Sequence, residues 1–207
     1  MKQRGFTLAE LAIVVTIIAL LLVGVMRGQS LINGAKAKDI IAIIDDLRNA
    51  KTFFKQRYKY LPGDWPYSAN TIPNVTAGTT VGTNGDGSIE GSLDAAGNAQ
   101  AGSEVAAVPW QLYSAGFLGK IDQTNPQRML STSFGPVQVV SIGVADGLVP
   151  GIAAANPSAR NAILFFNLPC DVAREVEAKI DDGVLNAGIA QYTACANNVV
   201  QWLAVVL

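Results

Sequence analysis

The most constraining feature of the chain is an apolar run near its amino terminus. Between Phe6 and Met26 the sequence reads FTLAELAIVVTIIALLLVGVM, and 17 of these 21 residues are apolar. As a helix that rises about 1.5 Å per residue, the run is roughly 31 Å long, close to the hydrocarbon thickness of a bilayer. The sequence therefore predicts a membrane-spanning helix.

Two other interpretations of this run are a secretory signal peptide and a buried core helix. The apolar part, Leu11 to Met26, slightly exceeds the roughly 7–15 residues of a signal-peptide core, and Val-Met-Arg-Gly follows where an Ala-x-Ala-like cleavage site is needed. A core helix would rarely begin so close to the start of a chain without a polar face. Both are therefore less favoured than membrane insertion.

Glu10 is the one ionisable residue within the run. A carboxylate in a membrane is costly enough to suggest a function. One interpretation is a protonated glutamate at the membrane interface. The other starts from cleavage between Gly5 and Phe6, which would create an α-amine four residues from Glu10. That amine could neutralise Glu10 of a neighbouring subunit, and a subunit out of register would leave a charge unpaired in an apolar bundle.

The segment Gly5-Phe6-Thr7-Leu8-Ala9-Glu10, behind a short basic leader and before a spanning helix, resembles the leader and first helix of type IV pilins and type II secretion pseudopilins. The resemblance implies that a membrane-embedded prepilin peptidase cuts after Gly5 and that the new amine of Phe6 is methylated. It also implies that Glu10 is the assembly carboxylate. Removing residues 1–5 leaves 202 residues, with 13 basic against 16 acidic side chains and a net charge of −3.

The same resemblance implies the partners and the location of the chain. The partners would be other copies or related subunits in a helical filament, together with an assembly platform protein and a cytoplasmic ATPase. The precursor would cross the bacterial inner membrane once with a cytoplasmic amino terminus. After assembly it would lie in a periplasmic or cell-surface filament.

Beyond Met26 the chain becomes amphipathic. Apolar residues recur every three or four positions, which places them on one helical stripe: Ile40, Ile43, Ile44, Leu47, Ala50, Phe54, Tyr58 and Leu61. Charged residues occupy other faces: Lys38, Asp45, Arg48, Lys55 and Lys59. The helix is expected to run from about Phe6 to Tyr60 and to stop at Pro62-Gly63. We thus expect a leader at 1–5, a membrane half at 6–26 and an amphipathic half at 27–61 that packs on a head.

The head, residues 62–207, is expected to be extracytoplasmic and to contain an antiparallel sheet. Short β-rich runs at 137–144, 162–168 and 199–207 are separated by turn signals. Two helices are expected, over 110–118 with an end at Gly116, and over 171–180. Residues 67–108 are rich in Gly, Ala, Thr, Ser and Asn, which predicts a long loop.

Within that loop, residues 84–90 read NGDGSIE, which is similar to the core of an EF-hand calcium loop. The alignment lacks two of the expected ligands, the first Asp and the bidentate Glu. An irregular oxygen site built from Asn84, Asp86, Glu90 and Asp94 is one interpretation, and a plain glycine-rich turn is the other. Calcium is the one cofactor that the sequence suggests.

Cys170 and Cys195 are the two cysteines of the chain. Outside the cytoplasm thiols oxidise, so an even pair predicts one disulfide. Two buried free thiols are the alternative. A cysteine-bounded segment near the carboxyl end also resembles the pilin pattern.

Composition excludes several kinds of chemistry. The chain has no histidine, so it lacks an imidazole base and cannot form the common zinc sites with only two cysteines. Its net charge of −1 argues against direct nucleic-acid binding, which needs a basic face. No phosphate-binding or dinucleotide motif is present in the sequence. An enzyme is therefore not expected.

These observations predict an α+β protein in which a long amino-terminal helix packs on a small antiparallel sheet. The function predicted first is a structural subunit of a type IV pilus or type II secretion pseudopilus. The alternative is a single-span, membrane-tethered binding module, such as an adhesin or a calcium-dependent lectin, whose helix is only an anchor.

Overall fold

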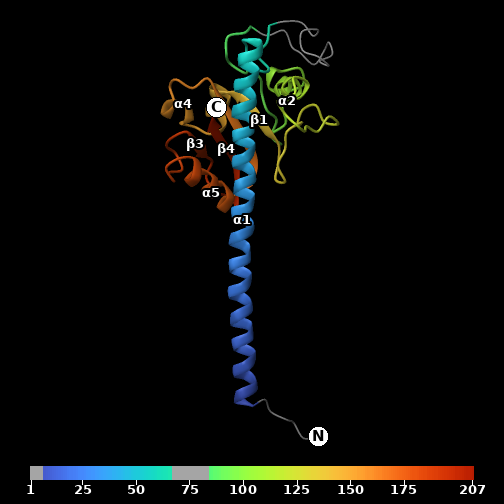
Figure 1. Cartoon of the computed structure of the whole chain (residues 1–207). Coiled ribbons are helices and arrows are strands. Elements are labelled where there is room, and N and C mark those ends of the chain that lie inside the picture. Colours follow the sequence, from blue (N-terminus) through green and yellow to red (C-terminus); the bar gives the residue numbers. More distant parts are fainter. Residues whose placement is uncertain (1–6, 67–83) are drawn as a thin grey trace.

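One helix, α1 (Leu8–Tyr58), runs the full height of the molecule and carries the head on its second half (Figure 1). The computed structural model describes residues 7–66 and 84–207. The remaining elements are α2 (Glu104–Ser114), β1 (Val137–Ser141), α3 (Ile142–Leu148), α4 (Ile152–Ala155), β2 (Asn161–Pro169), α5 (Cys170–Ile180), β3 (Ala190–Tyr192) and β4 (Val199–Val206). The predicted α+β arrangement of a long helix and a small antiparallel sheet is confirmed.

The two ends of α1 follow from local sequence. At its start Thr7 and Glu10 form a capping box, in which each side chain accepts a hydrogen bond from the backbone N–H of the other. At its end Lys59 adopts a left-handed conformation with φ of 69°. Pro62 follows three residues later and cannot continue a helix. The predicted end near residue 60 is therefore confirmed within two residues.

The first half of α1 projects from the head without any covering segment (Figure 1). Its large apolar side chains are mostly exposed, from Leu8 at 90% to Leu31 at 77%. By length and composition this helix is able to cross a membrane, and its most apolar window is entirely unburied. Exposed apolar surface on this scale requires lipid or another protein as its environment.

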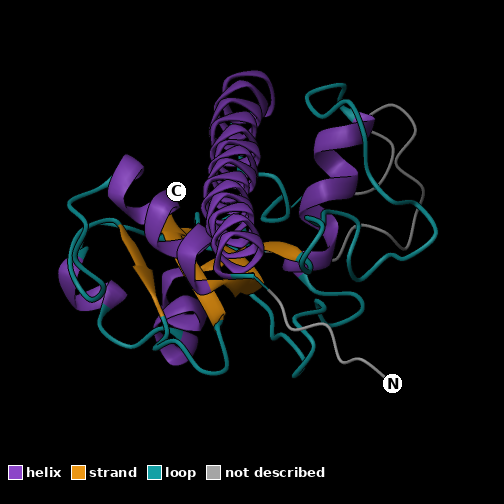
Figure 2. Ribbon diagram, turned by 90° about the horizontal axis from the view of Figure 1, so that it is seen from below, coloured by secondary structure: helices purple, strands orange, loops and turns teal. Residues whose placement is uncertain are grey.

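The second half of α1 buries the predicted stripe against the head. Ile40, Ile44, Leu47, Ala50 and Phe54 are each at most 2% exposed. Seen along α1, the helix lies over the strands with head segments on both of its sides (Figure 2). The expected amphipathic half is thus confirmed, and its apolar stripe is part of the core of the head.

The sheet has the order β1-β2-β4-β3, with every neighbouring pair antiparallel. The central strands β2 and β4 pair over most of their length, with Phe165 opposite Leu203. Side chains on both faces of β2 are buried from Asn161 to Phe165. This explains the continuous apolar run in the sequence, because a strand covered on both faces does not alternate.

Several predicted boundaries in the head need correction. The strand expected over 137–144 stops at Ser141, because the Ser141 hydroxyl caps α3 by accepting from the N–H of Val144. The loop expected over 67–108 ends earlier, because Ser103 caps α2 in the same way. The helix expected over 110–118 is therefore the second half of α2. Its end before Gly116 agrees with the φ of 79° at that glycine.

Three short elements, α3, α4 and β3, were not predicted from the sequence. They contain seven, four and three residues, too few for a periodic signal. The strands β2 and β4 and the helix α5 lie within two residues of their predicted ranges.

The orientation of α1 can be tested with two adjacent phenylalanines. Phe54 is fully buried and stacks edge-on with Trp65, their ring centroids 5.9 Å apart. Phe54→Ala should reduce the free energy of unfolding by about 3–5 kcal/mol, because it removes a core aromatic ring and leaves a cavity. Urea unfolding of the full chain in detergent micelles, followed by tryptophan fluorescence, measures this loss.

Phe53→Ala is the matched control, because Phe53 is 53% exposed. The expected loss is below about 1 kcal/mol, as for most surface substitutions. Equal losses for the two variants would contradict the orientation of α1.

Candidate functional site

The exposed start of α1 is the candidate functional site. Glu10 lies in the first turn, where its Oε2 accepts hydrogen bonds from the backbone N–H and the hydroxyl of Thr7, both at 2.8 Å. Among the residues that the structure describes, no cation lies within 4.0 Å of Glu10, since the two ion pairs found there are both on α5. Glu10 is also exposed, so its carboxylate can accept a partner from another molecule.

The other predicted residues of this site, Gly5 and Phe6, lie outside the described residues. What the structure does show is their continuation. From Leu8 onward the chain is helical without interruption, and its apolar side chains surround the helix on all faces. A helix that is apolar all round is suited to a membrane or to the middle of a bundle.

The residues of the suggested calcium loop make hydrogen bonds of their own. Asn84 Oδ1 accepts from the N–H of Asp86, and Asp86 Oδ1 accepts from the N–H of Ser88. Asp94 closes a separate turn by accepting from the N–H groups of Ala96 and Asn98. The Asn98 hydrogen bonds lower the pKa of Asp94. These contacts are those of glycine-rich turns.

The structure does not bring Asp86, Glu90 and Asp94 together. Within residues 7–66 and 84–207, only Glu177, Asp181 and Asp182 form a group of three acidic side chains with oxygens within 4.8 Å of one another. Glu177 and Asp182 each accept a hydrogen bond at 2.9 Å from a backbone N–H of the turn after α5, and Asp181 accepts one at 2.9 Å from the N–H of Ala190 at the start of β3. Their arrangement is accounted for by closing that turn.

Two buried acids, Asp64 and Glu104, were missed by the sequence reasoning. Asp64 is 1% exposed and accepts from the N–H of Gly87 at 2.6 Å. Glu104 is 7% exposed and accepts from the N–H of Glu90 at 2.7 Å. Together they fasten the segment 84–91 to the head. The only sequence signal for a role of Asp64 was its position directly after Pro62-Gly63, where α1 was predicted to stop.

The surroundings of these two acids disfavour their charged forms. Burial raises the pKa of Glu104 to about 7, and the negative charges of Asp64, Glu90 and Asp86 add to this shift. The hydrogen bond from Glu90 opposes it. Burial likewise raises the pKa of Asp64, against hydrogen bonds from the backbone of residues 85–87.

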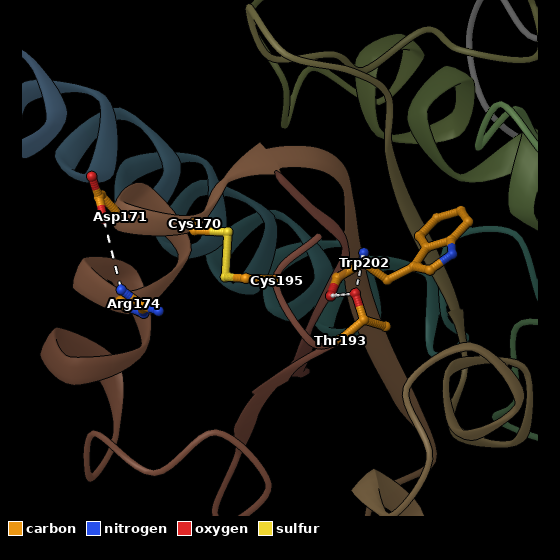
Figure 3. The surroundings of a disulfide bond; sticks show 6 residues. All are labelled: Cys170, Asp171, Arg174, Thr193, Cys195 and Trp202. Atoms are coloured by element: carbon orange, nitrogen blue, oxygen red, sulfur yellow. Dashed lines mark hydrogen bonds and ion pairs between the residues drawn. A yellow bond between two sulfur atoms is a disulfide. The ribbon is translucent and has the colours of Figure 1, made fainter. Parts of the chain in front are cut away.

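Cys170 and Cys195 are joined in a disulfide, with their Cα atoms 5.9 Å apart (Figure 3). Cys170 is the first residue of α5, and Cys195 lies in the loop between β3 and β4. Beside it, Thr193 exchanges hydrogen bonds with the backbone of Trp202. The bond therefore ties α5 to the connection that leads into the central strand β4. The nearby ion pair of Asp171 and Arg174 is largely exposed and contributes little.

The contribution of the disulfide can be measured by replacing both cysteines with serine. On the chain-entropy model, opening this loop, whose ends are 25 residues apart, lowers the free energy of unfolding by about 3.5 kcal/mol. Urea unfolding with and without reductant checks the value. Non-reducing peptide mapping checks the bond itself, and two free thiols would refute it.

The buried carboxyl of Glu104 predicts how stability depends on pH. Because its folded-state pKa of about 7 lies above the ordinary glutamate value of 4.5, the folded protein binds this proton more tightly than the unfolded chain. The contribution is fully present below about pH 4.5 and is lost as the pH rises to 7 and above. Thermal unfolding midpoints at pH 5, 6, 7 and 8 should therefore fall in that order.

Glu104→Gln should flatten this dependence, because glutamine keeps an oxygen for the Glu90 N–H but cannot ionise. Asp171→Asn, at a largely exposed carboxyl on α5, is the control and should keep the wild-type slope. An unchanged slope in Glu104→Gln would show that Glu104 does not titrate in this range.

Comparison with known proteins gives a family match over residues 1–26, which fit the prokaryotic N-terminal methylation motif. No curated protein and no solved structure matches the chain significantly. The matched range contains Gly5, Phe6 and Glu10, followed by the exposed apolar half of α1. With its α+β architecture of a long helix on a small antiparallel sheet, the chain carries the amino-terminal signature of type IV pilins and pseudopilins.

Proposed function

We propose that the protein is a structural subunit of a type IV pilus or type II secretion pseudopilus. The observation that carries the proposal is the exposed carboxylate of Glu10 on the otherwise apolar, uncovered first half of α1, within the methylation motif. In a plain membrane anchor this carboxylate would serve only to cap α1 with Thr7. A subunit that must align with its neighbours can also use it as a contact.

Processing at the amino terminus supplies the missing partner. In this proposal a prepilin peptidase cuts between Gly5 and Phe6, and the amine of Phe6 is methylated and stays cationic. A neighbour displaced along the filament axis until its Glu10 lies beside this amine would form the pair, so the pair sets the axial register.

Assembly then exchanges lipid for protein around the apolar half of α1. Residues 8–32 leave the inner membrane and pack in a bundle whose interior is equally apolar, so the exchange itself is weakly driven. Energy would come from the cytoplasmic ATPase, and the platform protein would guide each subunit. The proposal assigns no catalytic step to the chain.

Glu10→Ala separates this function from that of a simple anchor. The variant should still insert and be processed, yet its assembled fraction should fall at least 10-fold, because the amine of Phe6 loses its partner. Thr16→Ala is the control, since the Thr16 hydroxyl bonds only to the carbonyl of Ile13 in its own helix. The measurement is the amount of subunit in sheared filaments relative to the membrane.

Intact mass of the assembled material completes the test. A chain of 202 residues that begins at methylated Phe6 is expected. Retained Met1 in assembled material would refute the processing step, and normal function of Glu10→Ala would favour the membrane-tethered binding module.

A further inference from the structure

Two acidic and two basic side chains on the docked half of α1 lie on different flanks of the helix. Asp39 and Asp46 are exposed and lie two turns apart on one side of the buried stripe. Lys51 and Lys55 lie one turn apart on the other side. At 3.6 residues per turn the two pairs point about 150° apart around the helix.

The basic flank borders a hollow of about 790 Å³ between α1 and the head. Lys51, Lys55 and Arg160 line it. Within the described part of the chain no carboxylate lies within 4.0 Å of these three cations. Asp86 lines the same hollow, and its carboxylate accepts from Asn84 and Ser88. The three cations outnumber this one acidic side chain of the lining, so their positive charge is in excess.

The positive charges of this flank also repel one another. Burial lowers the pKa of Lys51, and the charges of Lys55 and Arg48 lower it further. Arg48 is itself held by the carbonyl of Val206 at 3.0 Å. An incoming carboxylate would relieve this repulsion.

The acidic flank has a smaller excess of negative charge, three acidic against two basic side chains in the hollows that it borders. Asp46 lines a hollow of about 820 Å³, in which Lys120 and Asp122 offset each other. Asp39 lines a smaller hollow of about 220 Å³ with Lys36, whose ammonium lies over the ring of Phe134 at 5.0 Å from its centroid. No cation of the described residues lies within 4.0 Å of Asp39 or Asp46.

We propose that the two flanks are complementary contact surfaces, so that Asp39 and Asp46 of one copy face Lys51 and Lys55 of a neighbouring copy. The inference rests on the proposed filament function and names the surfaces that join the heads. Because the two surfaces differ, the contact is heterologous, and a heterologous contact that does not close produces an open helical array.

The positions of the charges also give the shift between such neighbours. The midpoints of the acidic and basic pairs are about 10.5 residues apart along α1, which is about 16 Å. Parallel copies that contact through these flanks are therefore displaced along the filament axis by about this distance. Two copies without an axial displacement would not bring the acidic pair of one copy opposite the basic pair of the other.

Charge reversal tests the contact. Lys51→Glu with Lys55→Glu, and separately Asp39→Lys with Asp46→Lys, should each lower the assembled fraction at least 10-fold, because like charges then meet. The chain with all four substitutions should recover most of the assembly. Recovery is the decisive result, since damage to the fold by either pair would not be repaired by the other.

Arg174→Glu with Lys179→Glu is the matched control. It changes the net charge by the same −4 on α5, and Arg174 is 62% exposed there. This variant should assemble as the wild type does. A loss equal to that of the Lys51 and Lys55 pair would overturn the proposal, because net charge alone would then explain the effect.

Cross-linking tests directly whether the two flanks of neighbouring copies lie side by side. The described cysteines are both in the disulfide, so Asp46→Cys with Lys55→Cys adds two reactive thiols. A short bis-maleimide should give a ladder of covalent oligomers in filaments. This contact would be refuted if the wild-type chain forms filaments but the chain with all four substitutions does not recover assembly and the cysteine variant gives no ladder. The proposed filament function would then still stand. Absence of filaments from the wild-type chain would instead refute the function.

Discussion

The structure depends on the burial of one face of α1 in the head. Ile40, Ile44, Leu47 and Phe54 fill the space over the sheet, and the same helix continues without a break into the apolar half. Among the described residues, the core of the head thus forms one cluster with the buried face of α1. Membrane insertion and head folding are linked through one element, because the residues that pack the head are fixed in line with those that face lipid.

This arrangement explains which parts of the fold the sequence could predict. Long periodic segments, such as the stripe of α1 and the doubly covered strand β2, carry enough residues for a pattern to stand out. The strand β3 and the helices α3 and α4 do not, because packing against the larger elements decides their conformation. The early start of α2 was missed because Ser103 and Glu104 stand in a stretch whose composition is that of a loop.

The site shows the same division. Glu10 could be singled out from the sequence because it is the one ionisable residue in a long apolar run. The burial of Asp64 and Glu104 could not, because each is buried only by segments distant in the chain, as in the contact of Glu104 with residue 90. In the segment suggested as a calcium loop, the polar side chains of Asn84, Asp86 and Asp94 accept hydrogen bonds from backbone N–H groups of their own turns.

The unbroken helix has a mechanical consequence. In the proposed filament, tension along its axis would enter each subunit through the apolar half of α1 and pass to the head along the helix axis. A pull along the axis of α1 loads the buried side chains of the docked half in shear. Their contacts with the head therefore resist it together rather than one after another. The disulfide holds α5 to the segment that enters β4, so the central strand beneath α1 cannot peel away with its connection. A subunit built in this way should lose its neighbours before it loses its fold.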